Sequence, residues 1–213
     1  MRALHLFSNA KWTGPAEPAL NLCVALRRAG VEADFACTPE TAGGPHKILM
    51  TARDRGIEPV LAFSLPKHRN PVVNWLDARK LRAYLSSHPC DIVHCHLDND
   101  HRIAAGALRG LDIPLVRSNY GGEGFSPGMK ALFDRTALVL EPSRLALTHD
   151  VALGLPAEKA VVVPGAVDVV RFDPSREVPD QRAWLQIPRD AFVVGIVARK
   201  IGRASCRERV FSS

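Results

Sequence analysis

The sequence has no long apolar run and few cysteines, which excludes several common protein classes. No stretch approaches the roughly 18 consecutive apolar residues of a transmembrane helix, and polar residues interrupt the N-terminus too early for a secretory signal. Five of the 213 residues are cysteine, and their spacing fits neither a disulfide framework nor a four-thiol zinc site. We therefore expect reduced thiols and a cytoplasmic protein, with the inner face of the membrane as a second location.

The dinucleotide fingerprint G-x-G-x-x-G is also missing. The loop after the first apolar run, Ser8–Pro18, is where an NAD-dependent oxidoreductase would carry it. This loop has one glycine, Gly14, and the proline that follows it has no backbone N–H to offer an anion. Lys11 adds a positive charge nearby. The loop either approaches an anionic ligand at the start of the next helix or only turns the chain.

The basic excess is smaller than the formal net charge of +6 indicates. Residues Ile201–Val210, IGRASCRERV, match the in-frame translation of a common sequencing adapter, so we exclude Lys200–Ser213 from the fold. That segment has four bases and one acid, which leaves 24 bases against 21 acids, or +3. The correction removes the main argument for a nucleic-acid partner. A mild positive balance still suits an anionic donor or peripheral contact with an anionic membrane. The alternative is a native basic tail that contacts nucleic acid or lipid.

What the sequence does have is a regular alternation of buried strands and amphipathic helices. Near-continuous apolar strands that alternate with helices predict a doubly wound, Rossmann-like α/β fold with a parallel sheet. In such sheets ligands bind beyond the carboxyl ends of the strands. The predicted strands are Ala3–Phe7, Val31–Cys37, Pro59–Phe63, Asp91–His96, Pro114–Arg117, Ala137–Leu140 and Ala160–Val163. The predicted helices are Glu17–Arg28, His46–Arg55, Trp75–Ser87 (with Leu76, Leu81 and Leu85 on one side), Arg102–Arg109 and Arg144–Leu153, the last capped by Ser143.

The stretch Asp91–His101 carries more chemistry than any other. His94 and His96 share one face of a strand by the two-residue period, while the cysteine between them points to the opposite face. Three readings stay open: His96 in a ligand cleft, a buried hydrogen-bonded histidine, or a zinc site. The zinc site would combine both histidines with Asp98 or His101.

Residues Val161–Pro174 and the apolar run Ala191–Arg199 describe a chain that leaves one α/β domain and enters another. A strand, a Pro-Gly turn and an Arg-Phe anchor precede a stretch enriched in proline and charge, with a short helix expected near Trp184. We therefore expect a domain over residues 1–174, a linker over 175–190, the first strand of a second domain over 191–199, and adapter-derived residues over 200–213.

These two motif regions resemble family 4 glycosyltransferases of the GT-B fold. The family's passage between domains reads roughly P-N-G-V-D-x-x-x-F-x-P and then V-G-R, and one of its strands reads D-V-V-H-x-H. The matching residues here are Pro164, Gly165, Val167, Asp168, Phe172, Pro174 and Arg199, together with Asp91, Val93, His94 and His96. The resemblance implies the N-terminal, acceptor-binding domain of a retaining enzyme that uses a nucleotide sugar, with the second domain missing.

The same resemblance implies roles for individual residues. Arg199 would pair with the donor diphosphate, and His96 would lie in the cleft between the domains. Relatives often carry a histidine near Tyr120, so this chain departs from the pattern there. The family needs no metal and no cofactor besides its nucleotide-sugar substrate, and its catalytic residues belong to the missing half, so we expect this chain to be inactive. The substrate-binding residues implied are Lys11, Gly14, His96, Tyr120 and Gly121.

Two other functions stay open. A nucleotide-sugar epimerase of the same fold would need acid and base carboxylates in its cleft, for which Asp98, Asp100 and Glu123 are the candidates. A single-domain, non-enzymatic binding module would need neither the carboxylates nor a second domain. For a transferase, lipid, polysaccharide and small-molecule acceptors all stay open, because the sequence favours none of them.

Overall fold

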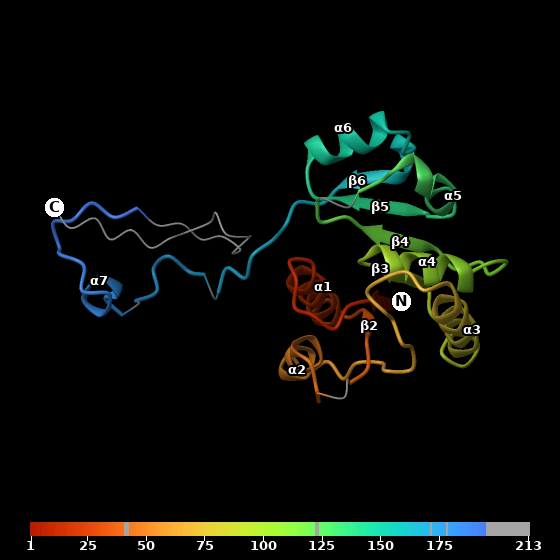
Figure 1. Ribbon diagram of the computed structural model, residues 1–213, viewed down its shortest axis with the longest axis horizontal. Coiled ribbons are helices and arrows are strands. Elements are labelled where there is room, and N and C mark those ends of the chain that lie inside the picture. Colours follow the sequence, from red (N-terminus) through yellow and green to blue (C-terminus); the bar gives the residue numbers. More distant parts are fainter. Residues whose placement is uncertain (41–42, 122–123, 171, 178, 195–213) are drawn as a thin grey trace. The chain divides into compact units, whose positions relative to one another are not determined.

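The chain forms two compact units, Met1–Ala166 and Val167–Ser213. The computed structural model describes residues 1–40, 43–121, 124–170, 172–177 and 179–194 (Figure 1). The first unit contains a sheet covered by helices. In the second unit, the helix α7 (Gln181–Trp184) is capped by Asp180, whose carboxylate accepts hydrogen bonds from the backbone N–H groups of Arg182 and Ala183. This confirms the short helix that was expected near Trp184.

The sheet of the first unit has six strands in the order β2-β1-β3-β4-β5-β6, and every pairing is parallel. This confirms the predicted doubly wound α/β fold. The central pairing of β1 with β3 sets His5 opposite His94. The carboxyl ends of all strands therefore meet at one edge of the sheet. The strands are β1 (Arg2–Phe7), β2 (Glu32–Cys37), β3 (Ile92–Cys95), β4 (Leu115–Ser118), β5 (Leu138–Glu141) and β6 (Ala160–Val162).

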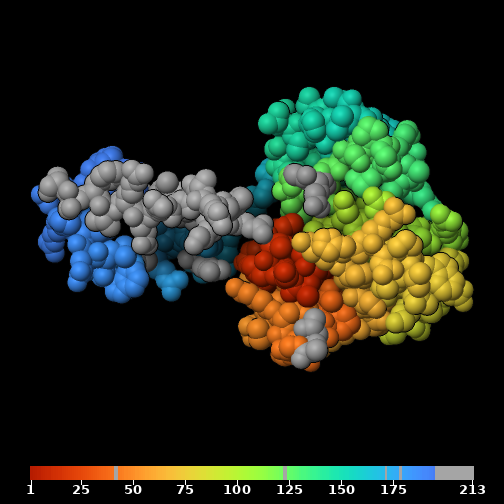
Figure 2. All heavy atoms as spheres, in the orientation of Figure 1, coloured from red at the N-terminus to blue at the C-terminus, as the bar shows by residue number. Residues whose placement is uncertain are grey.

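Helices cover both faces of this sheet. On one face, α1 and α2 pack with Phe7 and Phe35 into a buried apolar cluster. On the other face, α3 and α4 pack against Leu4, Leu6 and Val93, and the atoms of α3, coloured yellow, lie at the surface of the unit (Figure 2). The helices of this unit are α1 (Ala16–Arg28), α2 (Lys47–Asp54), α3 (Pro71–Ser87), α4 (Asp98–Ala107), α5 (Lys130–Phe133) and α6 (Arg144–Ala152), with short 3-10 turns at Pro127–Met129 and Ala157–Lys159. None of the described helices combines the length and the apolar content that crossing a membrane requires.

The predicted strand Pro59–Phe63 is wrong. Only Val60 pairs with the sheet, through a single bridge to Ala36. The chain then turns away because the buried Asp77 carboxylate on α3 accepts the backbone N–H groups of Ser64 and Leu65, at 2.9 Å each. Two backbone donors that a sheet would use are therefore held by a helix.

Three further differences concern the helices and the end of the chain. Helix α4 begins at Asp98, four residues before the predicted start, because the Asp100 carboxylate accepts the backbone N–H of Leu97 at 2.9 Å and closes the first turn. On α3 it is Asp77 that faces the core, while Leu76 is 44% exposed. Residues 191–194 have no regular secondary structure, and the rest of the predicted strand, including Arg199, lies outside the described residues.

Candidate functional site

Polar side chains gather at the carboxyl edge of the sheet, where β1, β3, β4 and β5 end. Three groups of residues can be distinguished there: a cluster of histidines, a chain of hydrogen bonds around Arg117, and a groove beside β5 and α6. Most of these residues lie in the second half of a parallel strand or just beyond its end, and helices α4 and α6 supply the others.

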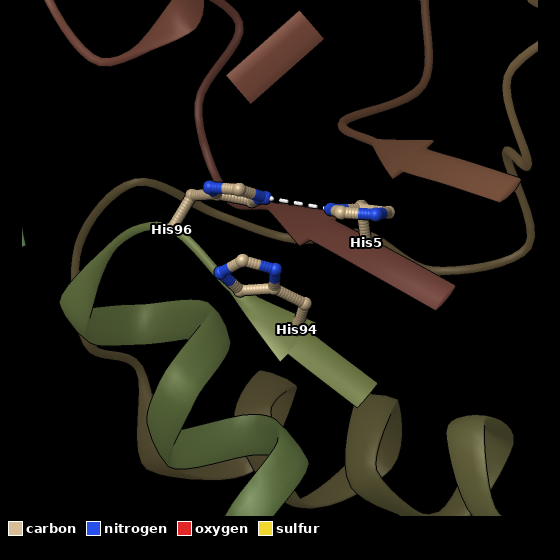
Figure 3. A group of neighbouring side chains, drawn as sticks. All are labelled: His5, His94 and His96. Carbon is tan, nitrogen blue, oxygen red and sulfur yellow. Dashed lines mark hydrogen bonds between the residues drawn. The ribbon is translucent and has the colours of Figure 1, made fainter. Parts of the chain in front are cut away.

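Three imidazoles, from His5, His94 and His96, stack on the face of the sheet that α1 covers (Figure 3). Their ring centroids are 4.5 to 5.3 Å apart, and their planes are inclined by 17° to 38°. Burial lowers the pKa of His5 to about 4 and lowers the pKa of His94 and His96 well below the ordinary value, the neighbouring imidazoles contributing to the last two. The cluster is therefore neutral at physiological pH. Its shared face was predicted for His94 and His96; His5 was missed, although it stands at an alternate position of an apolar strand.

The geometry does not fit a metal site. Among the residues that the structure describes, these three histidines are the one group whose ligand atoms lie close enough to hold an ion, all within 4.8 Å. A zinc ion needs in-plane nitrogen lone pairs that converge at about 2.0–2.1 Å, but stacked rings direct their lone pairs side by side. In addition, His5 Nδ1 and His96 Nε2 hydrogen-bond each other at 3.0 Å.

The other ligands that were considered for zinc lie on α4 and have different partners. Asp98 accepts a hydrogen bond from Arg117 at 2.9 Å. His101 Nε2 hydrogen-bonds Thr136 Oγ1 at 2.8 Å. The sequence-based grouping of these residues with His94 and His96 is therefore wrong, because the stretch that follows β3 is a helix rather than an extended loop.

His96 connects this cluster to the loop after β4. Its Nδ1 and the Tyr120 hydroxyl are hydrogen-bonded at 2.7 Å, and burial raises the pKa of Tyr120 to about 12. His96 is 1% exposed, and both of its ring nitrogens have protein partners. Tyr120 is half-buried, so any effect of His96 on a ligand would pass through Tyr120 in this arrangement.

Arg117 is the centre of the second group. Its side chain is 2% exposed, and it donates from Nη2 to Asp98 at 2.9 Å and from Nε to Asn119 Oδ1 at 3.1 Å. Its Nη1 lies 3.9 Å from Asp100 Oδ1. Asp100 also accepts the backbone N–H of Ser8 at 2.9 Å. One guanidinium therefore connects the first turn of α4 to the segment after β4, and Asp100 extends this connection to the loop after β1.

The hydrogen-bond chain continues through Asn119 to two carboxyl groups. Asn119 Nδ2 donates to Glu141 at 2.6 Å and approaches Asp150 at 3.5 Å, while Asp150 accepts the backbone N–H of Phe125 at 2.7 Å. Burial raises the pKa of Glu141 to about 7, with the Asp150 carboxyl adding to the rise and Asn119 opposing it. Burial likewise raises the pKa of Asp100 to about 7, against the pull of Arg117. Two carboxyl groups in this hydrogen-bond network, those of Glu141 and Asp100, thus have pKa values near neutral pH, where they can gain or lose a proton.

A groove of about 960 Å³ opens beside the carboxyl groups of Glu141 and Asp150. Its polar lining includes Asn119, Glu141 and Asp150, and Phe125, Met129 and Leu145 add apolar surface. A cavity of this size suits a small organic ligand. The side chains offer a proton acceptor, a proton donor and flat apolar contacts, which together can hold a hydroxyl-bearing molecule.

The structure places the predicted binding residues in two different regions. Tyr120 and Gly121 stand at the site, where Gly121 lines the groove with a φ of 87° that favours glycine. Lys11 and Gly14 are exposed in the loop after β1, and a Cβ at Gly14 would meet open space, so packing does not require glycine there. Sequence reasoning missed Asn119, Glu141 and Asp150. For Asn119 and Glu141 the available signal was a polar residue at the end of a parallel strand, whereas Asp150 lies on α6 and has no such signal.

Comparisons with known proteins agree with this architecture. The model of the family described as Glycosyltransferase Family 4 matches residues 13–171. A search of curated proteins gives no match. Among solved structures, a glycosyltransferase from Rickettsia africae ESF-5 superposes with a TM-score of 0.74 at 15% identity, over 89% of this chain and 50% of that one.

Two other solved structures share the fold. Anabaena Alr3699/HepE in complex with UDP and glucose gives a TM-score of 0.65 at 16% identity, over 87% of this chain and 49% of that one. UDP-GlcNAc 2-epimerase from Neisseria meningitidis, bound to UDP-GlcNAc, gives a TM-score of 0.58 at 14% identity, over 76% of this chain and 46% of that one. This chain therefore spans about half the length of the solved structures that it matches.

Proposed function

Because the chain belongs to glycosyltransferase family 4, we propose that it is the acceptor-binding half of an enzyme that moves a sugar from a nucleotide-sugar donor to an acceptor, with retention of anomeric configuration. The observation that carries this proposal is the groove beside Glu141 and Asp150. It lies at the carboxyl edge of a parallel sheet, which is where this class of fold binds its ligands.

The groove is proposed to hold the acceptor. Glu141 and Asn119 would hydrogen-bond the hydroxyl groups of the acceptor, since a carboxyl near its pKa can either accept or donate. Phe125 and Leu145 would pack against the less polar faces of the same molecule. The acceptor is therefore proposed to be a hydroxyl-bearing molecule that presents apolar surface as well.

The donor is proposed to be a nucleotide sugar that acts as a substrate and not as a cofactor. Support comes from solved structures of the same fold in complex with UDP and glucose, with UDP-glucose or with UDP-GlcNAc. Lys11 and Gly14 on the loop after β1 stay candidates for the donor phosphates, and so does Arg199, outside the described residues. Since the matched structures are about twice as long, we expect the 213-residue chain alone to release no nucleotide from any sugar donor.

The direct test begins with the source DNA. Sequencing across codon 200 should reveal an open reading frame of roughly another domain's length, and the protein that it encodes should release a nucleoside diphosphate only when an acceptor is present. Glu141→Gln in that protein should raise the KM for the acceptor while leaving the KM for the donor unchanged. Native codons for Ile201–Ser213 followed by a stop would contradict the two-domain proposal, as would absence of nucleotide release with UDP-, GDP- and ADP-sugars.

A second candidate, a nucleotide-sugar epimerase, is favoured by one observation. The Glu141 and Asp150 carboxyls share the groove, and the pKa of Glu141 lies near 7, as acid–base chemistry requires. The three carboxylates expected from the sequence support it less, because Asp98 is held by Arg117, Asp100 is fully buried, and Glu123 lies outside the described residues. The same assay separates the two functions. A transferase yields free nucleotide and a glycosylated acceptor, whereas an epimerase yields a new nucleotide sugar without an acceptor.

A further inference from the structure

Helix α3 turns an unusual face to the solvent. Its exposed residues include Val72, Trp75 and Leu76, which are 67%, 58% and 44% exposed. These three residues fall on one side of the helix by the i, i+3, i+4 spacing, opposite the buried Asp77, Leu81 and Leu85. A continuous apolar strip therefore runs along the first two turns of the outer face.

Positive charge surrounds this strip. In residues 59–90 the only acidic side chain is Asp77, which is fully buried and faces the core. The Arg79 guanidinium lies 5.0 Å from the centre of the Trp75 ring, a cation–π contact at the surface. The exposed basic side chains within residues 67–80 are Lys67, His68, Arg69, Arg79 and Lys80.

Buried hydrogen bonds hold this surface in place. Asp77 binds the backbone N–H groups of Ser64 and Leu65, and Asn99 Nδ2 donates to the Pro66 carbonyl at 2.6 Å. At the other end of the basic loop, Asn70 caps α3 by accepting the N–H groups of Val72 and Val73. The loop that carries Lys67 and Arg69 is therefore fixed at both ends beside the exposed tryptophan.

We propose that the outer face of α3, together with residues 67–70, is a docking surface that binds an anionic lipid membrane. The combination of bases with exposed valine, leucine and tryptophan matches an interface between anionic headgroups and acyl chains. A nucleic acid would engage the bases but would leave Val72 and Leu76 in water. The α3 atoms form a continuous part of the surface (Figure 2). The proposal does not depend on glycosyl transfer.

Flotation of the full chain with vesicles of phosphatidylglycerol and phosphatidylcholine in equal amounts tests the proposal. We expect binding that falls with salt, and little binding to vesicles of phosphatidylcholine alone. Lys67→Gln/Lys80→Gln should lower the partition coefficient by about 30-fold, and Trp75→Ala should lower it by about tenfold. The matched control, Arg28→Gln/Arg144→Gln, removes the same charge from exposed positions on α1 and α6 and should bind like the wild type.

A second measurement reports on the helix itself. In the variant Trp12→Phe/Trp184→Phe, Trp75 is the sole remaining tryptophan, and its emission should shift to shorter wavelength when the phosphatidylglycerol vesicles are added. Equal weakening by the α3 variant and the control would overturn the proposal, because net charge would then explain the binding. Binding to RNA but not to vesicles would overturn it as well, as would an unchanged Trp75 emission in the presence of bound vesicles.

Discussion

At the scale of single residues, Arg117 and Gly124 are the positions where the site tolerates least change. Arg117 is a buried cation whose Nη2 and Nε have acceptors in Asp98 and Asn119 and whose Nη1 faces Asp100. Gly124 brings the backbone directly against the Asp150 carboxylate. A buried charge that loses its partner is costly, and a backbone pressed against a side chain has no room for a Cβ.

Gly124→Ala should destabilise the protein. The new Cβ would overlap the Asp150 carboxylate, which cannot move freely because it accepts the Phe125 N–H. Overpacking of this kind costs about 1–3 kcal/mol, to be measured as a loss in the free energy of unfolding by urea. Gly128→Ala is the control, since a Cβ at that position meets nothing within 4 Å; equal losses for both variants would argue against the steric explanation.

Glu141 should make stability depend on pH. Its pKa is raised to about 7 in the folded state, so its protonated form contributes stability that is fully present below the unfolded pKa, near 4.5, and is lost as pH rises to about 7. Glu141→Gln removes this dependence, and the variant should therefore gain up to about 3 kcal/mol relative to the wild type between pH 4.5 and pH 7.5. Urea unfolding of both proteins at the two pH values measures the difference.

The effect of Glu141 must be measured as a difference between the variant and the wild type, because the histidine cluster makes stability change with pH in the opposite direction. The pKa of His5 is lowered to about 4, so its neutral form contributes stability above the unfolded value of 6.5 that is lost as pH falls to about 4. Burial lowers the pKa values of His94 and His96 as well, so their contributions to stability change with pH in the same direction. Both proteins share these losses, which cancel in the difference. A difference between the two proteins that does not change with pH would contradict the raised pKa of Glu141.

At the scale of elements, the alternation of apolar runs was sufficient to predict the strands that pair fully and every helix of the first unit longer than four residues. It failed where a side chain decides the path of the backbone. The run Pro59–Phe63 has the composition of a strand, but Asp77, some dozen residues further on, holds the backbone that follows it. The start of α4 was missed for a similar reason, since Asp100 closes its first turn. Such contacts depend on tertiary packing, which a periodic pattern does not record.

Asp77→Asn should therefore weaken the link between α3 and the segment before it. The amide keeps the shape of the carboxylate but has one acceptor oxygen, so one of the two N–H groups, of Ser64 or Leu65, loses its partner. We expect a loss of about 1–3 kcal/mol in the free energy of unfolding and faster amide hydrogen exchange at these two residues. Asp112→Asn, at an exposed position, is the control and should change neither quantity.

The candidate site was predictable in part for the same physical reason. The two-residue period placed His94 and His96 on one face of a strand, and the rule that ligands bind beyond the carboxyl ends of parallel strands drew attention to the loop that carries Tyr120. Glu141 and Asp150 were not found, because their proximity arises where helix α6 packs beside β5, and Asp150 lies nine residues after Glu141 with no strand period to connect the two. His5 needed the β1–β3 register, which no local pattern supplies.

At the scale of the whole molecule, the stability of the chain resides in its first unit. Among the residues that the structure describes, the three buried apolar clusters are formed by residues of Met1–Ala166. No described residue after Ala166 is buried, and several apolar side chains there, such as Val170 and Trp184, are 77% or more exposed. The second unit, as far as the structure describes it, has no core of its own.

A chain that ends at Ala166 should therefore fold on its own. We expect its free energy of unfolding to lie within about 0.5 kcal/mol of that of the full chain, since none of the described residues that the truncation removes is buried. Its far-UV spectrum should keep the helical signal of the first unit. Urea titration of both chains at equal concentration provides the measurement, and a loss of several kcal/mol on truncation would show that residues beyond 166 stabilise the sheet.

The hydrogen-bond chain around Arg117 has a consequence for protein engineering. The segments that would determine which ligand binds are connected by buried hydrogen bonds around Arg117, which serve as their anchors. A substitution at one of these anchors therefore affects several segments at once and changes ligand binding and stability together. Libraries meant to redirect ligand choice should accordingly vary groove-lining positions away from the anchors, such as Ser126 and, on α6, Leu145, and leave the anchors unchanged. Positions that line the groove can then vary while the buried hydrogen bonds around Arg117 preserve the fold.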